Sequence, residues 1–166
     1  RIESIVKGID ILDVNLIKKL PYVLSRNDYK ITLTYTNDEI IAIEGGDTSG
    51  NLYGLAIDIG TTTIAGVLIN LNTGEEVGVY SSINPQKQYG DDVISRIDYT
   101  MENRTGLEEL RAILVNEIND MLLYFESEFH IPANYIYHTS VVGNTIMLHI
   151  FIGAAVTQIA TAPFNP

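Results

Sequence analysis

The longest helical pattern in the sequence runs from Thr105 to Phe129 and limits the fold more than any other feature. Thr105 and Glu108 have the spacing of a capping box at its start. Ile131 and Pro132 end the pattern. We expect the apolar stripe of this helix to lie in a core and not in a ligand groove. The stripe recurs at helical spacing in Leu107, Leu110, Leu114, Ile118, Met121, Leu122, Phe125 and Phe129.

Strand patterns lie on both sides of this helix. Tyr53–Ile59, Thr63–Ile69 and Glu76–Ser82 are β-prone segments joined by short turns, which predicts an antiparallel meander. Tyr135–Val142 predicts a fourth strand, apolar enough to be central in the sheet, and an apolar helix opens at Gly143–Thr145. This order predicts an α/β or α+β fold whose sheet begins as a ribonuclease-H-like layer.

The first fifty residues predict a separate, small α/β domain. Asp13 can cap a short helix that we expect Pro21 to interrupt. Tyr29–Thr36 and Ile40–Ile43 then alternate or continue as two strands of a hairpin. Gly45–Asn51 has no periodicity and predicts a linker. We therefore expect one domain over residues 1–50 and another over 51–166.

Charge and composition exclude several classes of function. The 21 acidic and 10 basic side chains give a net charge of −11, which argues against binding to nucleic acid or to an anionic membrane surface. The sequence has no cysteine, which excludes disulfides and cysteine-held clusters within this chain and fits a cytoplasmic location. His130, His138 and His149 do not have the spacing of a zinc site.

The segment Asp58–Thr63 joins two predicted strands and has the composition of a phosphate-binding turn. Gly60 and the hydroxyls and N–H groups of Thr61, Thr62 and Thr63 can surround phosphate oxygens without a basic side chain. Asp58 would repel phosphates unless a cation lay between them, and Mg²⁺ meets that need. The alternative is an ordinary hairpin turn with a solvated aspartate.

These residues also resemble a known family. Leu55–Thr63 is similar to the first phosphate motif of the actin, Hsp70 and sugar-kinase ATPase superfamily. The whole set resembles, more narrowly, the ATP-dependent reductive activators of corrinoid proteins (RACo-like proteins). The narrower resemblance rests on further stretches in the same order, which are Glu44–Thr48 with Tyr53–Leu55, Asn84–Gln86, Tyr89–Ile97, Val142–Thr145 with Met147 and His149, and Ala162–Phe164.

The resemblance implies a fragment of a larger protein. In that family a ferredoxin-like domain with a [2Fe–2S] cluster supplies an electron, and an actin-like ATPase domain uses ATP and Mg²⁺ to drive reduction of Co(II) to Co(I) on a corrinoid partner. The chain resembles a middle or linker domain (1–50) and the truncated first part of that ATPase domain (51–166). ATP is held between two lobes in the superfamily, so the fragment alone is expected to bind it weakly and not to be catalytic.

The resemblance also implies roles for single residues. Asp58 would hold a Mg²⁺-bound water, and Gly60, Thr61, Thr62 and Thr63 would contact phosphates. Asn144 would help to orient the attacking water, with a plain helix N-cap as the alternative.

The segment after the meander allows more than one interpretation. Asp91–Thr100 predicts a short helix with Val93, Ile94 and Ile97 buried. Asp92 and Arg96 are four residues apart, so they favour a surface ion pair, although the segment could instead face the cleft or a partner.

Other functions stay open at this point. A small-molecule kinase of the same superfamily and a non-catalytic docking module are both compatible with the sequence. A truncated lobe can also leave apolar surface exposed, which leaves self-association as a homodimer open.

Overall fold

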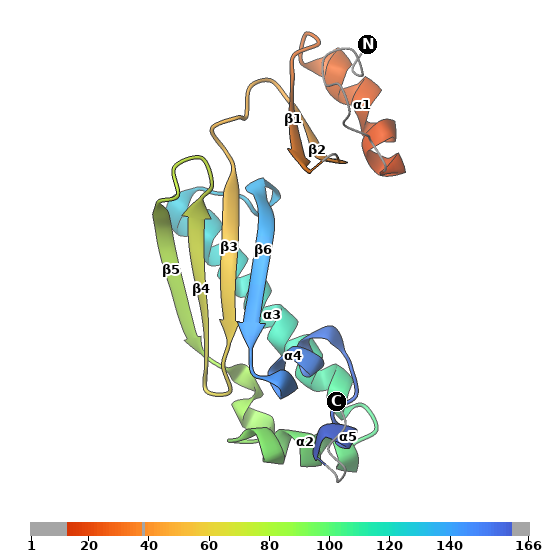
Figure 1. The fold of residues 1–166 in the computed structure, drawn as a ribbon, viewed down its shortest axis with the longest axis vertical. Coiled ribbons are helices and arrows are strands. Elements are labelled where there is room, and N and C mark those ends of the chain that lie inside the picture. The colour runs from red at the N-terminus through yellow and green to blue at the C-terminus, as the bar shows by residue number, and fades with distance from the viewer. Residues whose placement is uncertain (1–12, 38, 161–166) are drawn as a thin grey trace. The chain divides into compact units, whose positions relative to one another are not determined.

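The computed structural model describes residues 13–37 and 39–160, and the chain divides into two compact units between Leu52 and Tyr53 (Figure 1). The first unit contains helix α1 (Val14–Arg26) and the antiparallel strands β1 (Ile31–Thr36) and β2 (Glu39–Gly45). Val23 of α1 packs with Ile40 and Ile43 of β2 in a small core. The predicted hairpin is confirmed, and so is the predicted cap, because the Asp13 carboxylate accepts a hydrogen bond from the Asn15 N–H.

The expected interruption of α1 at Pro21 is wrong. The helix continues through Pro21 as far as Arg26. A proline inside a helix removes one hydrogen bond and costs about 3 kcal/mol. Continuation keeps Leu16 and Leu20, which precede the proline, on the same helix face as Val23, and all three belong to the same apolar cluster. This shared packing offsets the defect.

The second unit is built on a four-stranded mixed sheet. Its strands are β3 (Tyr53–Ile59), β4 (Thr63–Asn70), β5 (Glu76–Ile83) and β6 (Ile136–Gly143), in the order β5-β4-β3-β6. The first three form the predicted antiparallel meander, and β6 pairs in parallel with β3. The α/β fold class is therefore confirmed. Within the described residues β6 lies at a sheet edge, where its middle residues are exposed, and not at the predicted central position.

Helical segments connect β5 to β6 and follow β6. Between these strands lie the 3₁₀ segment η1 (Pro85–Tyr89), α2 (Val93–Glu102), α3 (Gly106–Phe129) and η2 (Ala133–Tyr135). After β6 come α4 (Thr145–Ile152) and α5 (Thr157–Ala160). Figure 1 shows the segment after β5, α2 and the start of α4 at the end of the sheet that holds the β3–β4 turn.

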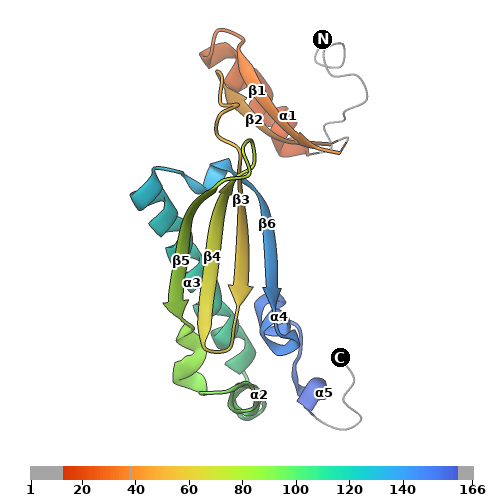
Figure 2. The same cartoon turned by 60° about the vertical axis from the view of Figure 1, so that its left-hand side comes forward.

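Helix α3 covers one face of the sheet and forms the main core with it. Both views show α3 running along the same face (Figures 1 and 2). Gly66 of β4 leaves room for Met121, because an added Cβ would stand 2.3 Å from its sulfur atom. The predicted apolar stripe is thus core, with the buried α3 residues Leu110, Leu114, Met121 and Phe125 packed against Leu55, Ile57, Ile64 and Leu68 of the sheet.

The start of α3 differs from the predicted capping box. Thr105 occupies the N-cap position, but its side chain makes no capping hydrogen bond to the backbone. Its hydroxyl instead donates to Glu109, and so does the hydroxyl of Tyr99. Tyr99 thus binds Glu109, the acidic residue one position after Glu108, and this contact links the end of α2 to the first turn of α3.

No helix among the described residues is long and apolar enough to cross a membrane.

The contact between Tyr99 and Glu109 predicts a pH-dependent stability. The hydrogen bond to Glu109, with burial, raises the pKa of Tyr99 to about 12 from its ordinary 10.0. The same hydrogen bond, with that of Thr105, lowers the pKa of Glu109 below its ordinary value of 4.5. Because the pKa of Glu109 is lower in the folded chain than in the unfolded chain, its carboxylate stabilises the fold above the unfolded pKa, and this stabilisation is lost as pH falls. The raised phenol pKa gives stability below pH 10 that is lost as pH rises towards 12.

We therefore expect Glu109→Gln to lower the urea midpoint of the chain at about pH 7. The difference from wild type should shrink at about pH 3, because the amide mimics the protonated carboxyl that wild type then contains. Glu108→Gln, at the exposed neighbouring position, is the control and should change the midpoint little at either pH. A pH-independent effect of Glu109→Gln would contradict the assignment.

Candidate functional site

The turn between β3 and β4 is the centre of the candidate site. Ile59 and Ile64 are buried at the two strand ends and fix the turn from Gly60 to Thr63 above the core. The Gly60 N–H donates to the Thr63 carbonyl oxygen at 3.0 Å. A Cβ atom at Gly60 would stand 2.6 Å from that oxygen, so only glycine fits this close approach. Thr62 and Thr63 are exposed, and Thr61 is half-buried.

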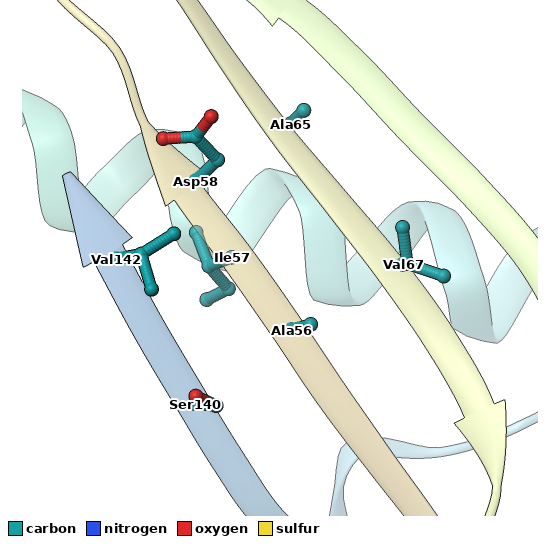
Figure 3. A pocket seen from close by; sticks show the side chains of 7 residues that line it. All are labelled: Ala56, Ile57, Asp58, Ala65, Val67, Ser140 and Val142. Carbon is teal, nitrogen blue, oxygen red and sulfur yellow. The ribbon is translucent and has the colours of Figure 1, made fainter.

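Asp58 lies two residues before the turn, on the sheet face opposite α3. Its side chain is exposed. It borders a shallow pocket of about 160 Å³ together with small and apolar residues of β3, β4 and β6. Figure 3 shows Asp58 beside Val142 at the ends of the parallel strands β3 and β6. The described residues contain no group of three or more histidine or acidic side chains that could hold a metal ion.

Residues that follow β5 donate hydrogen bonds to the carbonyl groups of the turn. The Asn84 side-chain amide donates to the Gly60 oxygen at 2.8 Å. The Asn84 N–H donates to the Thr62 oxygen at 2.8 Å. The Arg96 guanidinium donates to the Thr61 oxygen at 2.6 Å. All three successive carbonyl oxygens therefore point toward this supporting segment.

This arrangement determines where the N–H groups of the turn point. In a planar trans peptide the C=O of one residue and the N–H of the next point in opposite directions. The N–H groups of Thr61, Thr62 and Thr63 therefore point away from Asn84 and Arg96. Within the described part of the chain, no hydrogen bond uses the N–H of Thr61 or Thr62. The turn thus presents backbone donors in the manner of an anion-binding nest.

Arg96 is the residue for which sequence patterns were most misleading. The predicted helix is confirmed as α2, but Ile94 is 61% exposed and Arg96 is completely buried, the reverse of the expected arrangement. The ion pair between Asp92 and Arg96 is not formed. The Asp92 carboxylate instead accepts from the N–H and hydroxyl of Ser95 and caps α2. Arg96 points inward because the turn carbonyl oxygens offer it acceptors.

Asn84 and Gln86 complete the supporting segment, and both are completely buried. The Asn84 side-chain oxygen accepts from the Gln86 N–H at 2.9 Å. The Gln86 side chain accepts from Arg96 at 3.1 Å and donates to the Leu110 carbonyl of α3 at 2.9 Å. We define Asn84, Gln86 and Arg96 as the turn clamp. The sequence predicted a surface ion pair for Arg96 and did not indicate that Asn84 and Gln86 would join it in a buried network.

Asn144 joins the site from the end of β6. Its side-chain nitrogen donates to the Thr61 hydroxyl at 3.0 Å. Its side-chain oxygen accepts from the Met147 N–H at 3.0 Å, which caps α4. Asn144 therefore acts as the N-cap of α4 and also contacts the turn between β3 and β4. The structure brings Asn144 and Thr61 together, although they are far apart in the sequence.

We expect Gly60→Ala to destabilise the chain. The added methyl group would force the Thr63 carbonyl to move and would weaken the turn hydrogen bond, a steric change that typically costs about 1–3 kcal/mol. Gly50→Ala is the matched control, since an added Cβ there meets nothing within 4 Å. Urea denaturation would measure both variants. Equal stability of the two would show that the turn tolerates a side chain at position 60.

The fold and site together define a mixed α/β protein with an exposed, donor-rich turn at the end of its parallel strand pair. The chain belongs to the RACo family. Residues 53–166 match the family model described as the RACo middle region, and residues 4–50 match the one described as the RACo linker region.

Two relatives agree with this assignment. The chain is 28% identical over 172 residues to a protein from Eubacterium limosum named corrinoid activation enzyme RamQ, covering 92% of this chain and 29% of that protein. It also matches a solved structure titled reductive activator for corrinoid, iron-sulfur protein. That match has a TM-score of 0.83 and 32% identity and covers 98% of this chain and 27% of the other. The chain thus spans under a third of either relative.

Proposed function

We propose that this chain is part of an ATP-dependent reductive activator of a corrinoid protein and that it contributes the first phosphate-binding turn of the ATPase site. The observation that carries the proposal is the orientation of the turn. Its carbonyl oxygens are bound by the clamp, and the N–H groups of Thr61 and Thr62 face away from it. The names of the two relatives support a corrinoid protein as the partner.

The proposed roles follow from what each group can do chemically. The N–H groups and hydroxyls of Thr61, Thr62 and Thr63 would donate to phosphate oxygens, and Gly60 would allow the tight turn. Bound Mg²⁺ would neutralise phosphate charge and stabilise the transferring phosphoryl group. Asp58 is exposed and belongs to no group of three or more possible metal ligands among the described residues, so it fits the task of accepting a hydrogen bond from a Mg²⁺-bound water better than that of enclosing the ion.

Asn144 is proposed to fix the hydroxyl of Thr61, because its side-chain nitrogen already donates to that oxygen. Both ends of its amide have partners, so it is positioned without any ligand. A direct role in orienting the attacking water stays a prediction.

The wider architecture is also part of the proposal. The meander, the helical crossover and the parallel strand β6 support a ribonuclease-H-like beginning of an actin-like ATPase domain over residues 51–166, preceded by a small domain over 1–50. A [2Fe–2S] cluster would belong to another part of the full-length protein, because the 166 residues contain no cysteine. A cytoplasmic location and a homodimer stay predictions.

Calorimetric titration with Mg-ATP tests this function. The full-length protein should bind Mg-ATP and should reduce its corrinoid partner from Co(II) to Co(I) only when ATP is present. The 166-residue chain should bind more weakly, because the proposed site needs a second lobe. Absence of binding by both proteins would contradict the proposal and favour a docking module.

A further inference from the structure

The Arg96 side chain is a buried positive charge with only neutral hydrogen-bond acceptors. Its guanidinium donates to the carbonyl oxygens of Thr61 at 2.6 Å and Gly90 at 3.1 Å and to the Gln86 side-chain oxygen at 3.1 Å. The Met147 sulfur lies 3.2 Å from the same guanidinium. The side chain has no exposed surface. The two carboxylates whose charges act on Arg96, those of Asp91 and Asp92, are exposed and bind Lys87 and Ser95.

Such a charge is unfavourable for folding on its own. Removal of a cation from water costs several kcal/mol, and an adjacent carboxylate usually compensates for it. Here burial lowers the pKa of Arg96, and the charges of Asp92 and Asp91 offset this effect only in part. A neutral side chain of similar size could fill the same space, although it would donate fewer hydrogen bonds to the three oxygens that Arg96 binds. A charge at this position therefore calls for a reason beyond the filling of space.

The position of the charge supplies that reason. Arg96 holds the carbonyl whose peptide group carries the outward-pointing N–H of Thr62, so it fixes the direction of one proposed phosphate donor. Because no carboxylate contacts the guanidinium, its field also reaches the turn. Electrostatic interactions in such a buried setting are screened less than those on the surface. The turn, which has no basic side chain of its own, thereby gains a positive potential.

We propose that Arg96 is a positioning residue. It orients the backbone N–H donors of the turn towards a phosphate ligand, and its buried charge gives the turn a positive potential. Gln86 links Arg96 to helix α3 through the Leu110 carbonyl, and Asn84 holds the carbonyl groups on either side of Thr61. The turn clamp therefore works as one unit attached to the core. The inference rests on the proposed function, because it presupposes a phosphate ligand at this turn.

Arg96→Gln in the full-length protein tests the inference. It should raise the Kd for Mg-ATP by about tenfold or more, which is the size of effect known for loss of a group that orients the contacting residues. The loss should be smaller for Mg-ADP and smallest for adenosine, because the charge acts on phosphates. In the ligand-free protein, the backbone amide NMR signals of Thr61 and Thr62 should shift or broaden, because the Thr61 peptide group loses the bond that fixes its orientation. Arg104→Gln, which removes an exposed arginine from the same unit, is the control and should change none of these values.

Gln86→Glu covers the case in which Arg96→Gln fails to fold. This variant also removes the donor to the Leu110 carbonyl, so the comparison of Mg-ATP with adenosine isolates the effect of the charge. The new carboxylate can still accept from Arg96 but neutralises it. We expect a folded protein with weaker Mg-ATP binding and a smaller effect on Mg-ADP. If wild type binds Mg-ATP and both variants bind it equally well, or if adenosine binding falls as much as Mg-ATP binding, the role of Arg96 is wrong. If wild type binds no Mg-ATP, the proposed function and the inference both fail.

Discussion

Asp58→Asn in the full-length protein is expected to abolish ATP-dependent reduction of the corrinoid partner and to weaken Mg-ATP binding by about 100-fold. The substitution keeps the size of the side chain and removes its negative charge. Loss of an outer-shell partner of a metal ion typically costs between about 10-fold and 100-fold in affinity or activity. The variant removes the whole charge of Asp58, which is exposed and borders the pocket beside the turn, so we expect the upper end of this range.

Titration calorimetry and the cobalt reduction assay would measure these two effects. Asp98→Asn is the matched control, because Asp98 is also an exposed aspartate in the same unit, on α2. It should leave both values unchanged. Full activity of Asp58→Asn would remove Asp58 from the mechanism.

Phe125→Ala is expected to be the most destabilising single change in the core. Phe125 is completely buried in α3, and its ring lies 5.6 Å from that of Tyr124 and 6.2 Å from that of Phe129, centre to centre. Truncation of a buried phenylalanine leaves a cavity and typically costs about 3–5 kcal/mol of unfolding free energy. That is a large part of the stability of an ordinary domain.

Leu123→Ala provides the comparison within the same helix, since Leu123 is 62% exposed. This change should stay within about 0.5 kcal/mol of wild type. Urea denaturation of the 166-residue chain would give both values. Similar losses for the two variants would contradict the burial of the α3 stripe against the sheet.

Periodicity in the sequence predicted most of the elements of this fold. The meander from β3 to β5 and helix α3 have side-chain patterns that match their burial, and β1 pairs with β2 as predicted. The errors arise where tertiary contacts outweigh a local rule. Pro21 stays inside α1 because residues on both sides of it share one cluster. Glu109 replaces Glu108 at the start of α3 because Tyr99 reaches it from α2.

The candidate site was predictable only in part. The turn from Gly60 to Thr63 could be found because a glycine, three successive threonines and a nearby aspartate between two strands have the composition of a phosphate-binding turn. The clamp could not be found in this way, because its purpose depends on carbonyl groups that turn inward only in the folded protein. Arg96 was assigned to the surface on helical spacing, and Ile94 to the core. The structure reverses them because Arg96 satisfies the Thr61 and Gly90 carbonyl oxygens.

A crystal structure of the full-length protein with Mg²⁺ and a non-hydrolysable ATP analogue would test the central claim most directly. We predict phosphate oxygens within hydrogen-bond distance of the N–H groups of Thr61 and Thr62, with Asp58 facing a Mg²⁺-bound water. A nucleotide bound elsewhere, with the turn unoccupied, would contradict the account.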